Sequence, residues 1–108
     1  MADKSWKAFE RKIAGVMGGE RVPVSGRERG YAPDVRCERW SIECKVREKL
    51  PVLLMQAVDQ AKKSAKVNQL PVVFLKQKYS KFSDTLVVLK ITDFLMLSGG
   101  TSGKEEEY

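Results

Sequence analysis

The sequence predicts an α/β fold, a single domain in which one mixed β-sheet of about five strands is flanked by helices. The chain has 108 residues, enough for one hydrophobic core and too few for two. Segments with helical periodicity alternate with short apolar runs rich in β-branched residues. A strand, a helix and a strand follow one another between residues 41 and 75, which implies a right-handed crossover and some parallel pairing.

The composition excludes several classes of protein. Hydrophobic residues make up 43% and charged residues 31%, which is typical of a soluble globular domain and not of a disordered chain. No apolar run approaches the roughly 20 residues of a membrane span, and the first residues lack the apolar core of a signal peptide, so we expect a cytoplasmic protein with no membrane partner. A net charge of +6 favours a polyanionic partner.

The chain contains no histidine. This excludes nucleophiles activated by histidine and metal sites with histidine ligands. Any bound metal would have to be held by oxygen atoms, which favours magnesium or manganese.

The first expected element is an amphipathic helix over residues 4–17 that ends at Gly18-Gly19. Its apolar stripe consists of Trp6, Phe9, Ile13, Val16 and Met17. Glu10 borders this stripe, so its carboxylate needs a partner. The simplest alternative for Glu10 is a surface ion pair with Lys7 or with a residue one turn further along the helix.

A short strand over residues 21–24, a glycine-flanked loop over 25–31 and a hairpin over 34–47 follow. Side chains alternate in the second half of this hairpin, so that one face carries Ser41, Glu43, Lys45 and Arg47 and the other carries Trp40, Ile42, Cys44 and Val46. Cys37 and Cys44 both point to the apolar face, and we expect them to be reduced core residues.

A turn at Glu38-Arg39 would set the register of the hairpin. It would pair Arg36 with Ser41, Val35 with Ile42, and Asp34 with Glu43. Two carboxylates opposed across strands repel each other unless a cation or a proton relieves them, and a divalent metal is the natural relief. The alternative is an ordinary solvated strand face.

The second half of the chain contains a predicted helix over residues 50–66, two apolar strands over 70–75 and 85–91, and a short helix over 93–97. We expect Leu50, Leu53, Leu54, Ala57, Val58, Ala61 and Ala65 to face inward on the first of these helices, with Lys62, Lys63 and Lys66 outward. The two strands are expected to be buried on both sides, and a polar connection over 76–84 joins them. Thr92 is the expected cap of the last helix, which ends at Ser98-Gly99-Gly100.

A helical glutamate, a Pro-Asp pair, a Glu-x-Lys triplet and a helix after the third strand together resemble the PD-(D/E)xK nuclease superfamily, here in Glu10, Pro33-Asp34 and Glu43-Cys44-Lys45. Within it, the chain resembles the small phage and archaeal Holliday-junction resolvases, with the virus-type replication-repair nucleases as the close alternative. The resemblance covers about residues 5–90. It implies a restriction-endonuclease-like nuclease domain over residues 1–97, followed by a flexible C-terminal tail over 98–108.

The resemblance also implies roles for individual residues. The set that would hold Mg²⁺, with Mn²⁺ as a substitute, is Asp34, Glu43, the main-chain carbonyl of Cys44 and, either directly or through water, Glu10. Lys45 would orient or deprotonate the attacking water and stabilise charge on the phosphate. A glutamine of the helix after the third strand would reach the same cleft, and Gln60 is favoured over Gln56.

The function implied is a magnesium-dependent DNA endonuclease that resolves four-way junctions in recombination and repair. Two related cuts require two sites, so we expect a homodimer, in the host cytoplasm if a phage encodes it. The residues expected to contact DNA are Ser25, Gly26, Arg27, Arg29 and Arg47. The alternatives are a structure-specific or nicking nuclease, a catalytically silent DNA-binding module, and a small interaction protein whose basic surface is incidental.

Overall fold

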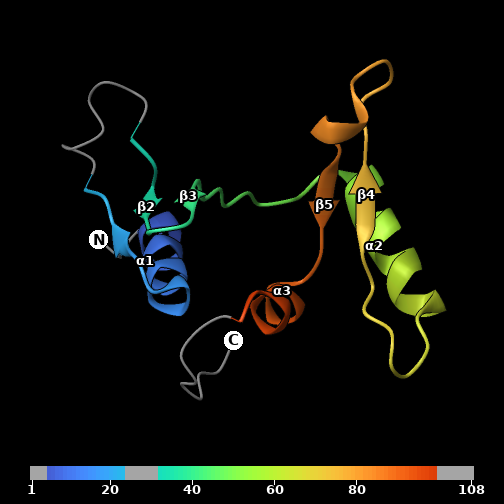
Figure 1. Cartoon of the computed structure of the whole chain (residues 1–108), viewed down its shortest axis with the longest axis horizontal. Coiled ribbons are helices and arrows are strands. Elements are labelled where there is room, and N and C mark those ends of the chain that lie inside the picture. Colours follow the sequence, from blue (N-terminus) through green and yellow to red (C-terminus); the bar gives the residue numbers. More distant parts are fainter. Residues whose placement is uncertain (1–4, 24–31, 100–108) are drawn as a thin grey trace. The chain divides into compact units, whose positions relative to one another are not determined.

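The computed structural model describes residues 5–23 and 32–99 (Figure 1). In chain order, its elements are α1 (Ser5–Met17), β1 (Glu20–Arg21), β2 (Val35–Arg36), β3 (Ser41–Ile42), α2 (Val52–Ser64), β4 (Val73–Leu75), the 3-10 helix η2 (Phe82–Asp84), β5 (Leu86–Val88) and α3 (Ile91–Ser98). They belong to two compact units, one formed by the described residues up to Glu48 and the other by Lys49–Gly99. The expected α/β class is confirmed.

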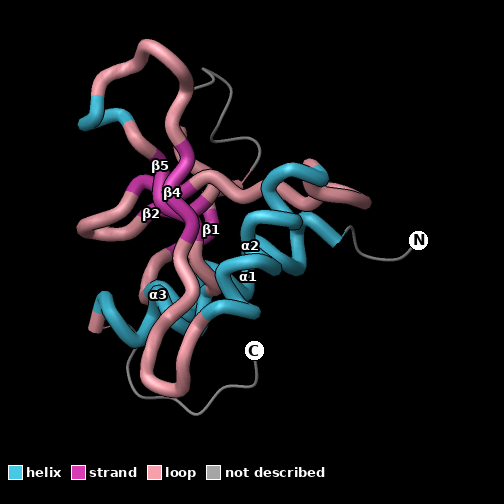
Figure 2. Tube along the Cα trace, turned by 90° about the vertical axis from the view of Figure 1, so that its right-hand side faces the viewer, coloured by secondary structure: helices cyan, strands magenta, loops and turns pink. Residues whose placement is uncertain are grey.

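The expected single mixed sheet is replaced by two antiparallel sheets. The first unit contains a three-stranded sheet in the order β1-β2-β3, and the second contains the pair β4-β5. Every described strand is only two or three residues long and pairs with a neighbour in sequence. The β2-β3 and β4-β5 connections are shorter than the roughly dozen residues that a parallel crossover needs. Loops and turns accordingly make up much of both units (Figure 2).

In the first unit, α1 packs against the apolar face of the β2-β3 hairpin. The helix ends at Met17, as the sequence predicts, and Gly18 follows with a left-handed φ of 69°. The buried core consists of Ala14, Val35 and Cys44, against which Ile13, Cys37 and Ile42 pack. Both cysteines are free thiols, also as predicted.

Gly19 allows α1 and β2 to approach each other closely. A Cβ atom built at Gly19 would lie 2.5 Å from the carbonyl oxygen of Arg36 and in direct contact with the sulfur of Cys37. The amide of Gly19 donates to the carbonyl of Ala14 at 2.9 Å, which holds the chain in place as it leaves the helix. The requirement for glycine here is therefore steric.

In the second unit, α2 contacts one side of the β4-β5 hairpin (Figure 1). Val73 and Leu75 are half-buried, whereas Phe74 is 67% exposed and its cross-strand partner Val87 is also exposed. The prediction that these strands are buried on both sides is therefore wrong for this face, because a single helix covers only one side of a hairpin. Leu50 and Leu53, both expected to face inward on this helix, are likewise exposed, and Leu50 precedes the start of α2.

The last helix is longer than predicted. It begins at Ile91, so Thr92 lies inside the helix and is not its cap, and Lys90 occupies the cap position without a side-chain hydrogen bond. Gly99, with a φ of 79°, ends the helix where the sequence predicts. Among the described residues, no helix combines the length and the apolar character needed to cross a membrane.

Candidate active site

The β2-β3 hairpin has the register that the sequence predicts. Val35 pairs with Ile42 and Arg36 with Ser41. The amide of Cys37 donates to the carbonyl of Trp40 at 3.3 Å, which closes the turn at the expected place. The guanidinium of Arg39 lies 5.5 Å from the centre of the Trp40 ring, a cation–π contact within the turn.

The ladder becomes irregular at Asp34. Its amide donates to the carbonyl of Ile42 at 2.8 Å, although Ile42 is already the register partner of Val35. Its carbonyl accepts a hydrogen bond from the amide of Val22 at 2.9 Å. Two residues of one strand thus share one partner, as in a β-bulge, a feature that often redirects a side chain next to a functional site. The regular pairing stops before Asp34 and Glu43 would face each other.

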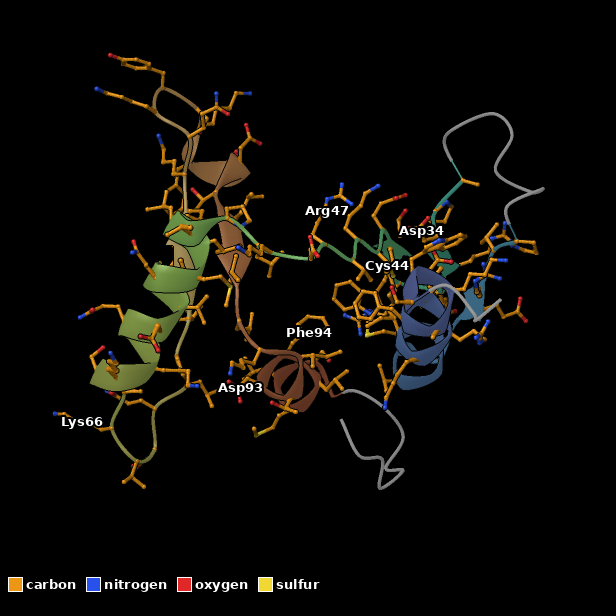
Figure 3. The ribbon with its side chains drawn as sticks, turned by 180° about the vertical axis from the view of Figure 1, so that it is seen from behind. Asp34, Cys44, Arg47, Lys66, Asp93 and Phe94 are labelled. Carbon is orange, nitrogen blue, oxygen red and sulfur yellow. The ribbon has the colours of Figure 1, made fainter. Side chains whose placement is uncertain are left out.

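The carboxylate of Asp34 instead lies against the backbone of the Glu-x-Lys triplet. Its Oδ2 atom accepts a hydrogen bond from the amide of Cys44 at 2.6 Å, and both residues are buried (Figure 3). That amide belongs to the peptide bond that joins Glu43 to Cys44. A short, charge-assisted bond of this kind fixes the position of the carboxylate. Asp34 and the triplet are therefore brought together, though by a side chain to backbone contact.

The side chains of the triplet alternate as expected. Cys44 is buried, whereas Glu43 and Lys45 are exposed, and all three residues follow the end of β3. Arg47 is also exposed, but so is Val46, which the sequence predicts to lie on the apolar face, so the alternation ends at Lys45. The triplet thus contacts the Asp34 carboxylate through its backbone and exposes one carboxylate and one amine to solvent.

Glu10 is buried in an ion pair that sequence reasoning missed. Its side chain is only 3% exposed, and its Oε1 atom accepts a hydrogen bond from Nε of Arg21 at 2.8 Å. The guanidinium of Arg21 also lies 5.7 Å from the centre of the Trp6 ring, where Lys7 lies at 5.5 Å. Arg21 of β1 thus provides a partner for Glu10, and helical spacing carries no signal of a residue from another element.

The predicted metal ligands can be compared with the ligands that a metal ion requires. Within residues 5–23 and 32–99, no group of three or more acidic, cysteine or histidine side chains is close enough to hold an ion. Asp34, Glu43 and the carbonyl of Cys44 remain as an all-oxygen set. Such a set suits Mg²⁺, which commonly binds one or two carboxylates and completes its shell with water and substrate phosphate.

The other expected site residues belong to the second unit or fall outside the described residues. Gln56 and Gln60 are exposed residues of α2 in the second unit, and the Gln60 carbonyl accepts a hydrogen bond from Ser64 at 3.0 Å. Ser25, Gly26, Arg27 and Arg29 lie outside the described residues. Their roles stay predictions.

Comparison of the chain with known protein families, with curated proteins and with solved structures found no match. The function must therefore be inferred from the residues themselves. The feature with the clearest chemical meaning is the buried carboxylate of Asp34, which is hydrogen-bonded to the backbone of a triplet whose Glu43 and Lys45 side chains are exposed.

Proposed function

We propose that this protein is a magnesium-dependent DNA endonuclease that hydrolyses phosphodiester bonds and resolves four-way DNA junctions. The observation that carries the proposal is the hydrogen bond between the Asp34 carboxylate and the Cys44 amide. It joins the Pro-Asp and Glu-x-Lys motifs, which are separate in the sequence but meet in one hairpin. The net charge of +6 supports a polyanionic substrate.

Asp34, Glu43 and the carbonyl of Cys44 would hold the ion, with Mn²⁺ able to replace Mg²⁺. A bound divalent ion would polarise the phosphate and lower the pKa of an attacking water. The protein supplies the geometry: Asp34 is held by the backbone, so less freedom is lost when a ligand binds. Lys45, exposed beside it, would orient the water and stabilise negative charge on the phosphate.

Glu10 is given an indirect role in this proposal. Its carboxylate neutralises Arg21 and ties β1 to α1, which positions the hairpin that carries Asp34. Contact with the ion would then pass through water, one of the two modes that the resemblance allows. Direct ligation would require Glu10 to give up a 2.8 Å contact with a guanidinium.

The proposal also includes the fold of the domain, the oligomeric state, the cellular location and residues outside the site. They are a restriction-endonuclease-like nuclease domain over residues 1–97, a homodimer that makes two symmetric cuts, and action in the cytoplasm. Gln60 is proposed to assist at the site, and the loop residues Arg27 and Arg29 to contact phosphates.

A catalytically silent DNA-binding module is the second candidate. The observation in its favour is the ion pair of Glu10 with Arg21, which occupies one of the three carboxylates of the expected metal set. Both candidates bind DNA, so only the dependence of cleavage on magnesium separates them.

The test is cleavage of a synthetic four-way junction, compared with duplex, flap and single-stranded DNA at equal concentration, with Mg²⁺ and with EDTA. Glu43→Ala and Asp34→Asn should abolish cleavage while junction binding in Ca²⁺ persists. The side-chain amide oxygen that Asp34→Asn introduces can still accept from the Cys44 amide, so this variant should keep the fold. Glu38→Ala is the matched control, since it removes an exposed carboxylate from the same hairpin.

Cleavage by wild type and by Glu38→Ala, but not by Glu43→Ala, would support the nuclease. Undiminished magnesium-dependent turnover by Glu43→Ala would remove the central claim. Binding of junctions by the wild type without any cleavage in Mg²⁺ or Mn²⁺ would favour the silent module.

A further inference from the structure

The loop that connects β4 to β5 in the second unit combines lysines with exposed aromatic rings. We call residues 76–84 the hairpin tip; its cationic residues are Lys76, Lys78 and Lys81, and its acidic residue is Asp84. Tyr79 is 91% and Phe82 87% exposed. Large aromatic side chains usually bury most of their surface, so two such rings on one short loop indicate a binding surface.

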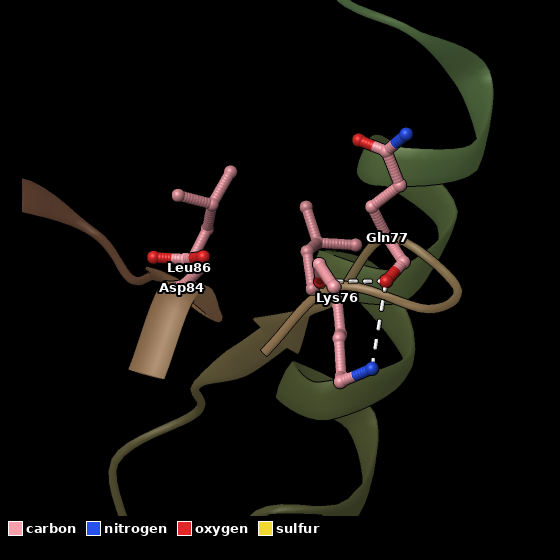
Figure 4. A pocket seen from close by; sticks show the side chains of 6 residues that line it. Lys76, Gln77, Asp84 and Leu86 are labelled. Atoms are coloured by element: carbon pink, nitrogen blue, oxygen red, sulfur yellow. Dashed lines mark hydrogen bonds between the residues drawn. The ribbon is translucent and has the colours of Figure 1, made fainter. Parts of the chain in front are cut away.

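Internal hydrogen bonds define the shape of the hairpin tip. The carbonyl of Gln77 accepts from the amide of Ser80 at 3.0 Å and from its hydroxyl at 2.6 Å, and Nζ of Lys76 lies 3.5 Å from the same oxygen (Figure 4). Tyr79, at the centre of this turn, has a left-handed φ of 71°. A tyrosine in this conformation costs about 1 kcal/mol or more, and such strain is concentrated at functional positions.

A lysine followed directly by an aromatic residue occurs twice in the hairpin tip. Lys78 precedes Tyr79, and Lys81 precedes Phe82, so a cation is followed by an aromatic ring at an interval of three residues. Nζ of Lys78 lies 5.4 Å from the centre of the Tyr79 ring. A nucleotide offers the complementary pair, one anionic phosphate and one flat base.

We propose that the hairpin tip binds unpaired nucleotides of a DNA strand, with Tyr79 and Phe82 stacking on bases and the three lysines contacting phosphates. Basic grooves with aromatic platforms are the usual means of binding single-stranded nucleic acid. Base stacking explains the exposure of the two rings, which phosphate contacts alone do not require. This site is distinct from the proposed active site, and binding at it needs no metal.

The open cavity beside the tip supports a role in binding. It has a volume of about 490 Å³ and is lined by Leu75, Lys76, Gln77, Ser80, Asp84 and Leu86. Figure 4 shows Lys76 and Gln77 on one side and Asp84 and Leu86 on the other. Its apolar and polar lining is suited to the edge of a base that stacks at the tip.

The experiment compares two oligomers of equal length and charge, one of thymidine nucleotides and one with abasic sites throughout. Binding of the full chain to each is measured by fluorescence anisotropy in EDTA. Wild type should bind the thymidine oligomer more tightly. The Tyr79→Ala/Phe82→Ala variant should lose affinity for it by about 5- to 100-fold for each stacking contact that the oligomer makes, while its affinity for the abasic oligomer stays unchanged.

The lysines are tested by their effect on salt dependence. Replacing Lys76, Lys78 and Lys81 by alanine should weaken binding to both oligomers and reduce the slope of log affinity against log salt by roughly two. Lys66→Ala/Val67→Ala is the matched control, because these exposed residues lie on the loop between α2 and β4, at the other end of the hairpin (Figure 3). This control should bind both oligomers like wild type.

Equal binding of the two oligomers by wild type would overturn the proposal, as would an unchanged affinity for thymidine in the aromatic variant. Binding to phosphatidylserine vesicles that depends on Tyr79 and Phe82, without binding to thymidine, would also overturn it and assign the tip to a membrane surface. Because the binding assays contain EDTA, these results do not depend on cleavage. If the protein binds the thymidine oligomer through the tip but cleaves no DNA, the binding site proposed here stands and the proposed nuclease function fails.

Discussion

Replacing Gly19 by alanine should destabilise the first unit. The new Cβ atom would lie 2.5 Å from the carbonyl oxygen of Arg36, and real Cβ atoms do not approach other atoms so closely. The sulfur of Cys37, the other contact, can rotate away, but Arg36 belongs to the central strand β2, which pairs on both sides. Overpacking of this kind costs about 1–3 kcal/mol of the free energy of unfolding.

Gly15→Ala is the matched control. A Cβ atom at Gly15 meets no other described atom within 4 Å, and the residue lies inside α1. Alanine is a better helix former than glycine by roughly 0.5–1 kcal/mol, so this variant should be as stable as wild type or more stable. The two variants make the same chemical change, and their free energies of unfolding should differ from each other by about 1.5–4 kcal/mol.

The assay is urea unfolding followed by tryptophan fluorescence, with thermal unfolding as a second measurement. For a domain of this size, each kcal/mol corresponds to a shift of about 4–8 °C in Tm. A Gly19→Ala variant as stable as wild type would show that the end of α1 does not contact β2, and the described packing of the first unit would then be incorrect.

Two further predictions concern the site. Glu10→Ala should lower the free energy of unfolding by about 1.5–3 kcal/mol in urea titrations, because a hydrogen bond to a charged guanidinium is lost in a buried place. The double variant with Arg21→Ala should cost less than the sum of the single variants, and strict additivity would argue against the pair. Lys45→Ala should leave stability unchanged, since the side chain is exposed, yet slow junction cleavage on the order of a hundredfold, with Lys45→Arg failing to restore it. A normal rate in single-turnover assays would make Lys45 an ordinary surface residue.

The hairpin that carries the site could be predicted from the sequence. A strand has a side-chain period of two, so the alternation from Ser41 to Lys45 indicates which residues share a face, and a turn at Glu38-Arg39 then determines the register. Trp40 and Val46, predicted on the buried face, are exposed. The irregularity at Asp34 could not be predicted, because a bulge adds one residue to a strand without changing the pattern of residue types. The consequence is large: the carboxylate contacts a backbone amide instead of facing Glu43.

Contacts between segments that are distant in sequence could not be predicted either. Periodicity placed Glu10 at the border of the apolar stripe, whereas Glu10 is buried and Phe9, a predicted member of the stripe, is 39% exposed. Periodicity has no information on the approach of Arg21 from β1, which provides the partner of Glu10. The apolar runs around Phe74 and Val87 predicted strands that are covered on both sides. Periodicity identifies the faces of an element, whereas what covers each face depends on how segments such as α2 pack against it.

Both tryptophans of the chain, Trp6 and Trp40, lie in the first unit, and the second unit holds two of the three α-helices that the described residues form. Tryptophan fluorescence therefore reports on the surroundings of α1 and the β2-β3 hairpin, while far-ultraviolet circular dichroism is weighted towards α2 and α3. The protein thus carries its own pair of independent optical signals. If the two units unfold as one cooperative domain, the two urea transitions will coincide; if they unfold separately, the curves will part, with no label or truncation required.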